Sequence, residues 1–292
     1  MKRFLSRFIL LVVVMLCIIF AMHVVAVWNL RDDLERTYTI NPSTEILFVG
    51  SSEFGCSICE TNETRNIRMI WTSDTILPSC LMRLKELDRR GQLSGLKTVA
   101  VPFNVTSLRK HDKRGYLWAW YQELPLSWYY MDLFPYPMFD FAAYAACNLR
   151  FPFQFHLTDA TPIRDSLASL KPEKKECLLS RFKDVAYEIS AEGFSSEEEN
   201  CVLATYCAMK SLCDEHGIRF VVIKAPLLPI FAEALSYEYK QSILAFEDKL
   251  KAQGIELIAV DVPMDESFFF DYIHMVEPGS VMYTEAVVQL IK

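Results

Sequence analysis

The sequence has no basic patch, and its 292 residues carry a formal net charge of −7 at pH 7. Proteins that bind nucleic acids usually gather lysine and arginine on one surface, where these residues neutralise phosphates. The composition therefore argues against a nucleic acid as a partner. The charged runs at 171–176 and 197–199 are mixed or short, and solvated helix faces explain them.

A second CxxC motif is also lacking, as is a histidine pair at zinc-finger spacing. Cys56 and Cys59 form the one CxxC among nine cysteines. This spacing fits a redox or metal site, but small buried thiols are the simpler interpretation. We therefore expect neither a metal nor a cofactor. The pairing of cysteines in an oxidising compartment does not follow from the sequence.

Only one apolar run, residues 8–28, is long enough to cross a bilayer as a helix. Lys2, Arg3 and Arg7 precede this run, and an acidic segment follows it at 31–35. The positive-inside rule then places the N-terminus in the cytoplasm and the rest of the chain outside it.

A cleaved signal peptide is the alternative interpretation of the same run, with a cleavage site at Ala26. The run is longer than the usual signal core of roughly 7–15 residues, so we favour an uncleaved anchor. We therefore expect a single-pass protein of the cytoplasmic membrane. Residues 1–30 would form the cytoplasmic tip and transmembrane anchor, and residues 31–292 would form an extracytoplasmic domain.

Beyond this run, segments with the character of buried strands alternate with segments of helical periodicity. Strands separated by helices predict a parallel sheet with right-handed crossovers and both faces covered. We therefore expect an α/β fold with a five-stranded parallel sheet, without internal repeats. The expected strands are 45–49, 66–71, 96–104, 218–226 and 255–263, and the expected helices are 77–91, 196–216, 233–253 and 279–291.

An aromatic-rich insertion interrupts this alternation at about 110–165. Prolines break the segment repeatedly, so a single regular helix is not expected there. Its apolar character is too strong for a solvated loop. An insertion folded over the core is the simplest interpretation. The more specific interpretation is a functional one, in which the segment forms a lid or ligand wall, or an aromatic surface that rests on a membrane.

The first expected strand ends in an unusual way, because its apolar residues run into Gly50, Ser51 and Ser52. One explanation is an ordinary turn into a helix, with a serine as the N-cap. The other is a nucleophilic serine held at the edge of a sheet. A serine needs a base to become a good nucleophile.

The chain offers such a base after its last expected strand, where Asp271 precedes His274 by three residues. A carboxylate at this spacing can hold one nitrogen of the imidazole and leave the other to take a proton from a serine. Polar residues also follow the second strand, at Ser73, and the third strand, at Asn104. The carboxyl ends of parallel strands meet at one edge, so these side chains are expected to converge.

Two of these blocks carry a resemblance to a known family. The stretch "FVGSSEF" at 48–54, and Asp271-x-x-His274 with Gly279, resemble the first and last motifs of SGNH (GDSL-like) hydrolases. The first stretch is particularly similar to the start of the membrane-anchored D-alanyl transfer proteins of teichoic-acid biosynthesis and of related anchored envelope proteins. The resemblance spans residues 45–292. It implies a flavodoxin-like three-layer α/β/α fold and ester chemistry.

The resemblance also implies roles for individual residues. Ser52 matches the family's nucleophile, and Asp271 and His274 match the other two members of its triad. Ser51 replaces the aspartate that commonly precedes the nucleophile, and it remains the alternative nucleophile.

The family's oxyanion hole uses the nucleophile's own amide, a glycine after the second strand and an asparagine after the third. Ser52 and Asn104 match the first and last of these groups. Thr72 or Ser73 stands where the glycine is expected, so Ser73 is the third candidate.

Three classes of function follow from these residues. The first is an esterase that removes acyl groups from an envelope glycan or polymer. The second is an acyltransferase, in which a glycan hydroxyl replaces water and a membrane-bound acyl-transfer partner is expected. The third is a catalytically inactive envelope protein with a binding or structural role. An α/β-hydrolase fits less well, because Phe54 occupies the second glycine position of its G-x-S-x-G motif.

Overall fold

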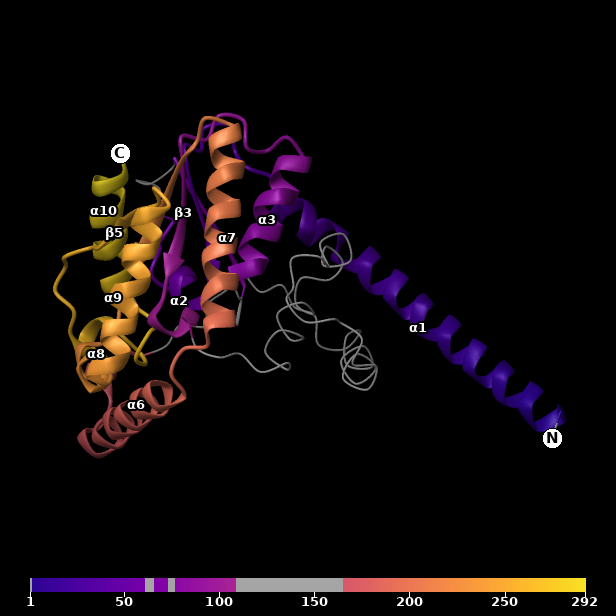
Figure 1. Cartoon of the computed structure of the whole chain (residues 1–292), viewed down its shortest axis with the longest axis horizontal. Coiled ribbons are helices and arrows are strands. Elements are labelled where there is room, and N and C mark those ends of the chain that lie inside the picture. The colour runs from indigo at the N-terminus through magenta and orange to yellow at the C-terminus, as the bar shows by residue number, and fades with distance from the viewer. Residues whose placement is uncertain (1, 61–65, 73–76, 109–164) are drawn as a thin grey trace.

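The computed structural model describes residues 2–60, 66–72, 77–108 and 165–292 (Figure 1). Its centre is a five-stranded parallel sheet with the strand order β2-β1-β3-β4-β5. The α/β class and the five-stranded parallel sheet expected from the sequence are therefore confirmed. The strands are β1 (Ile46–Ser51), β2 (Ile67–Thr72), β3 (Thr98–Phe103), β4 (Arg219–Lys224) and β5 (Glu256–Ile258).

Helices cover both faces of the sheet, which is consistent with a three-layer α/β/α arrangement (Figure 1). The crossovers from β2 to β3, β4 and β5 all step in one direction, so α3, α7 and α9 lie in a row over one face. α10 packs on the other face. The helices are α1 (Lys2–Thr37), α2 (Ser52–Gly55), α3 (Leu77–Arg89), α6 (Pro172–Glu192), α7 (Ser196–Glu215), α8 (Pro229–Ala234), α9 (Tyr237–Ala252) and α10 (Gly279–Ile291).

The core lies around the three central strands. Every residue of β3 is buried, and Leu47 to Val49 in β1 and Val221 to Ile223 in β4 have no exposed surface. Strands covered on both faces need continuous rather than alternating apolar residues. This requirement explains why these strands could be predicted from the sequence.

Several elements differ from the expected pattern, among them α8, which is separate from α9 although one helix was expected over 233–253. β5 is much shorter than the strand expected over 255–263, because only Glu256, Leu257 and Ile258 pair with β4. α6 was not anticipated, because it packs against the domain through few buried residues and its surface carries mixed charge. Those buried residues are Phe182, Ala186 and Ile189.

The insertion expected at 110–165 cannot be compared with the structure, because residues 109–164 lie outside the described part. α1 includes the apolar run 8–28 and extends away from the α/β domain (Figure 1). Within the described residues, no helix is both long enough and apolar enough to traverse a membrane. The anchor over 8–28 and the single-pass topology therefore stay predictions.

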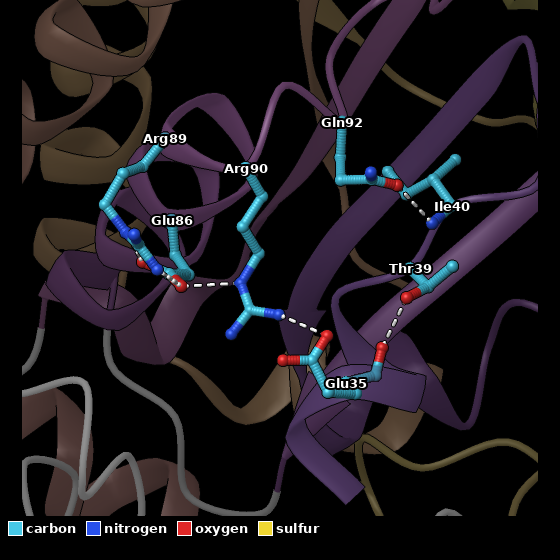
Figure 2. Close-up of polar contacts among 7 residues, drawn as sticks. All are labelled: Glu35, Thr39, Ile40, Glu86, Arg89, Arg90 and Gln92. Carbon is cyan, nitrogen blue, oxygen red and sulfur yellow. Dashed lines mark hydrogen bonds and ion pairs between the residues drawn. The ribbon is translucent and has the colours of Figure 1, made fainter. Parts of the chain in front are cut away.

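The C-terminal end of α1 is tied to the end of α3 by polar contacts (Figure 2). The Arg90 guanidinium joins the two helices, with Nε 2.6 Å from Glu86 Oε1 and Nη1 3.0 Å from Glu35 Oε2. It also lies 5.4 Å from the centre of the Tyr38 ring, within the range of a cation–π contact. α3 runs antiparallel to the strands, so this cluster lies at the edge of the sheet opposite to their carboxyl ends.

The short segment that follows α1 is held by two further hydrogen bonds (Figure 2). The Thr39 hydroxyl donates to the carbonyl oxygen of Glu35 at 2.6 Å. The backbone N–H of Ile40 donates to the Gln92 side chain at 2.9 Å. The chain is therefore fixed where it passes from α1 toward β1.

Glu86 is the buried acid of this cluster, with 1% of its side chain exposed. Arg89 and Arg90 both donate to its carboxylate. Burial alone would raise the pKa of Glu86, but the hydrogen bonds from the two arginines outweigh burial and hold that pKa below its ordinary value. The ionised carboxylate therefore stabilises the folded state.

We predict that Glu86→Gln lowers the free energy of unfolding at pH 7 by about 1.5–3 kcal/mol, because hydrogen bonds to a charged group are lost. The difference from wild type should shrink as the pH falls through about 4.3, the ordinary glutamate value, toward the lower pKa of the folded state. Urea unfolding at pH 7 and at lower pH measures both effects. Asp248→Asn is the control, because the Asp248–Lys251 pair is exposed. A pH-independent loss in Glu86→Gln would contradict the prediction.

Candidate active site

Ser52 is the first residue of the short helix α2, directly after the central strand β1. Ser51 is the N-cap and keeps an extended backbone, with φ −92° and ψ −175°. The chain therefore turns sharply from strand to helix at the two serines. The carbonyl of Ser52 accepts a hydrogen bond from the N–H of Cys56 at 2.8 Å, which closes the turn.

Two glycines allow this turn to pack closely. A Cβ on Gly50 would lie 3.0 Å from Phe54 and 3.1 Å from Pro102, and a Cβ on Gly55 would lie 2.3 Å from the ring of Trp71. A contact of 2.3 Å does not occur between real atoms, so position 55 needs glycine, whereas a side chain at position 50 would push Phe54 or Pro102 aside by a few tenths of an ångström. Phe54 folds back beneath the strand end and is fully buried. The backbone before and after Ser52 is thereby held against the core.

The pairing between β1 and β3 stops before the serines. β1 pairs with β2 as far as Ser51 opposite Thr72, but its pairing with β3 ends at Phe48 opposite Ala100. Pro102 of β3 has no N–H group and cannot continue the ladder. In the strand order β2-β1-β3-β4-β5, the chain leaves β1 toward β2 on one side and leaves β3 toward β4 on the other side. Folds of this kind bind ligands where the direction reverses, which here is between the carboxyl ends of β1 and β3.

The carbonyl of Pro102 is satisfied from another element. The hydroxyl of Tyr206, a fully buried residue of α7, donates to this oxygen at 2.7 Å. Burial raises the pKa of Tyr206 well above its ordinary value, so the hydroxyl keeps its proton. α7 thereby anchors the end of β3 beside the two serines.

Asp271 and His274 lie in a tight loop whose two arms are hydrogen bonded to each other. The N–H of Phe270 donates to the carbonyl of His274 at 3.2 Å, and the N–H of Val276 donates to that of Phe268 at 2.8 Å. Asp271 Oδ1 accepts from the backbone N–H groups of Ile273 at 2.9 Å and His274 at 2.8 Å. The aspartate therefore shapes the turn that carries the histidine.

The structure brings Ser52, His274 and Asp271 together in one hydrogen-bonded chain. Ser52 Oγ lies 2.9 Å from His274 Nε2, and His274 Nδ1 lies 2.7 Å from Asp271 Oδ2. The side chains of His274 and Asp271 are mostly buried, at 19% and 25% exposed. In this geometry the imidazole can accept the serine proton while the carboxylate fixes its orientation.

Ser51 points elsewhere. Its hydroxyl donates to the carboxylate of Glu53. Of the two serines, Ser52 is therefore the one that faces His274.

Asn104 directly follows β3 and is 5% exposed. The register of β1 and β3 pairs Ile46 with Thr98, and the same offset would set Ser52 level with Asn104. Asn104 Oδ1 accepts a hydrogen bond from the Thr106 N–H at 3.1 Å, which orients the side-chain amide. Ser73, the other expected oxyanion donor, lies outside the described residues.

Two residues near the site were not anticipated. Arg83 of α3 is 1% exposed, and its guanidinium donates to the carbonyl of Gly50 at 3.0 Å. Phe270 stacks on the imidazole of His274. A run of three phenylalanines directly before Asp271 could have pointed to an aromatic contact such as that of Phe270. Nothing in the sequence distinguishes Arg83 from a surface arginine.

The CxxC pair lies just after α2, and both cysteines are half-buried. Burial raises the pKa of the Cys59 thiol, and the carboxylates of Glu277 and Glu60 raise it further. Reactive thiols have lowered pKa values, so this environment does not favour a redox role. In the described part of the chain, no three or more His, Cys, Asp or Glu side chains are placed to hold a metal ion.

No protein-family model matches this chain, and no curated protein matches it significantly. The fold and the geometry define an α/β protein with a Ser–His–Asp chain at the carboxyl edge of its sheet.

We predict that Tyr206→Phe lowers the free energy of unfolding by about 1–3 kcal/mol, because the carbonyl of Pro102 loses a buried hydrogen-bond donor. Urea unfolding of the full chain measures the change. Tyr187→Phe is the matched control, because Tyr187 is 59% exposed, and its effect should stay within about 0.5 kcal/mol. Equal effects of the two substitutions would contradict the structural role of the Tyr206 hydroxyl.

Proposed function

We propose that this protein is a serine-dependent esterase or acyltransferase that acts on acyl esters. The observation that carries the proposal is the hydrogen-bonded chain from Ser52 through His274 to Asp271. A serine, a histidine and a carboxylate in this order form the machinery of acyl transfer on several unrelated folds. The resemblance to SGNH hydrolases rests on the same residues and supports the same chemistry.

In the first step, His274 Nε2 takes the proton of the Ser52 hydroxyl as Oγ attacks the carbonyl carbon of the ester. A tetrahedral intermediate forms, with its negative charge on the former carbonyl oxygen. His274 then returns the proton to the leaving alcohol as the ester bond breaks. The acyl group remains on Ser52 as a new ester, and Asp271 stabilises the transient imidazolium.

In the second step, His274 takes a proton from an acceptor, which attacks the acyl-serine. Water as the acceptor releases a carboxylic acid and makes the protein an esterase. A glycan or polymer hydroxyl makes it an acyltransferase. In both cases the proton returns to Ser52, and the starting state is restored.

The oxyanion needs hydrogen-bond donors in a fixed position. The backbone N–H of Ser52 and the side-chain amide of Asn104 are the proposed donors, with Ser73 as a third candidate. Asn104 would donate through Nδ2, because its Oδ1 accepts from the N–H of Thr106.

The proposed substrate is an acylated glycan or polymer of the cell envelope, outside the cytoplasmic membrane. The similarity to anchored D-alanyl transfer proteins supports this substrate class and a membrane-bound acyl-transfer partner. Among the described side chains of α1, Phe8, Leu16 and Phe20 are exposed, as a membrane-embedded segment would require. The alternative function is that of a catalytically inactive envelope protein with a binding or structural role.

We predict that Ser52→Ala and His274→Ala each lower the hydrolysis of p-nitrophenyl acetate by about 10⁴-fold or more. The double variant should be little slower than either single variant, because the two residues act as one unit. A fluorophosphonate probe should label the wild-type protein and fail to label Ser52→Ala.

Ser51→Ala is the matched control, because its hydroxyl is next in sequence but bonds to Glu53. It should keep labelling at a rate close to that of wild type. Labelling of Ser52→Ala at the wild-type rate would exclude Ser52 as the nucleophile. A wild-type protein that does not react with the probe would favour the inactive alternative.

We predict that residues 31–292 lie outside the cytoplasmic membrane. Protease added to intact spheroplasts that express the full chain should digest this domain, while a cytoplasmic reporter protein in the same cells should survive. The physical basis is the basic start before the apolar run 8–28. Protection of the domain under these conditions would refute the topology.

A further inference from the structure

The imidazole of His274 is held at three places, and the proposed reaction uses only two of them. Asp271 bonds to Nδ1, and Ser52 lies against Nε2. The third contact is with a face of the ring. Phe270 stacks there with its centroid 5.2 Å from that of the imidazole and an interplanar angle of 4°.

The backbone holds the two rings in this arrangement. Phe270 and His274 face each other across the tight loop, where the Phe270 N–H donates to the His274 carbonyl at 3.2 Å. The next pair outward, Phe269 and Met275, forms an antiparallel bridge. The stack is therefore part of the loop that also positions Asp271.

Phe270 is less buried than its neighbour Phe269. Phe269 points into the interior and has no exposed surface, whereas Phe270 is half-buried. Tyr272, which follows Asp271, anchors the other side of the loop by stacking on Phe231 with ring centroids 4.4 Å apart. Phe269 and Tyr272 therefore attach the loop to the domain, and Phe270 is directed at the histidine.

An aromatic face attracts a cation placed within about 6 Å of its centroid. The imidazole is neutral before the reaction and becomes an imidazolium when it takes the serine proton. The contact with Phe270 therefore strengthens as the charge develops. An interaction that is stronger in the transition state than in the ground state accelerates the chemical step.

We propose that Phe270 is a positioning residue that orients His274 and stabilises its protonated form during acyl transfer. This inference rests on the proposed function. The ring does not touch the reacting atoms and acts through the imidazole. The loop from Phe270 to His274 would then stabilise the imidazolium in two ways. The Asp271 carboxylate bonds to the edge of the imidazolium ring, and the Phe270 ring covers one of its faces.

The test replaces Phe270 in the full chain by phenylalanines with one, two and three fluorine atoms. Fluorine withdraws electrons from the ring face and changes its size little. The values of kcat and KM for p-nitrophenyl acetate, and the rate of fluorophosphonate labelling, are measured for each variant. We expect kcat to fall stepwise with each fluorine, by roughly 2- to 30-fold in total, with KM unchanged.

The control is the same fluorine series at Phe194, which stacks on Tyr239 with centroids 4.5 Å apart. No cation forms there, so kcat should not change. Phe270→Tyr should keep most of the activity, and Phe270→Leu should lose it to at least the extent of the trifluoro variant.

A kcat that does not depend on fluorination at position 270, in a protein whose Ser52 still reacts with the probe, would overturn the role of Phe270 alone. A wild-type protein whose Ser52 does not react would overturn the proposed function and this inference with it. A stepwise fall of the same size at Phe194 would also overturn the inference, because the effect would then be general.

Discussion

The hydrogen bond between Ser52 Oγ and His274 Nε2 joins residues that are 222 positions apart, and the rest of the site is arranged around it. Neither partner is on a free loop. Ser52 is set by the end of the central strand β1, and His274 is set by a turn that the Asp271 carboxylate closes. A proton can pass between such groups only at hydrogen-bond distance, so both frames must be rigid.

The segments that carry Ser52 and His274 are both anchored in the core by residues that take no part in the proposed chemistry. On the serine side, Phe54 packs beneath the turn, and Arg83 donates to the carbonyl of Gly50 from α3. On the histidine side, Tyr272 stacks on Phe231 of α8. A buried guanidinium costs several kcal/mol of desolvation unless it is hydrogen bonded, and the bond from Arg83 to the Gly50 carbonyl both offsets part of this cost and fixes the end of β1.

Local patterns in the sequence determined most of the fold and one half of the site. The apolar runs of β1, β3 and β4 were readable because strands buried on both faces need continuous apolar residues. The spacing of Asp271 and His274 was informative because a carboxylate three residues away can reach the imidazole within one turn. Alternating strands and helices predicted a parallel sheet, and with it the edge where polar residues would meet.

The tertiary structure alone decided the features that depend on contacts between distant segments. Ser51 and Ser52 are adjacent residues of the same type, and in the sequence only the family resemblance favours Ser52; which hydroxyl faces the histidine near the other end of the chain depends on the tertiary structure. The early end of the β1–β3 ladder, the short β5 and the stacking of Phe270 on His274 likewise depend on contacts between separate segments of the chain. A sequence pattern shows which face of a single helix or strand is apolar. The features named here depend instead on how the helices and strands pack together.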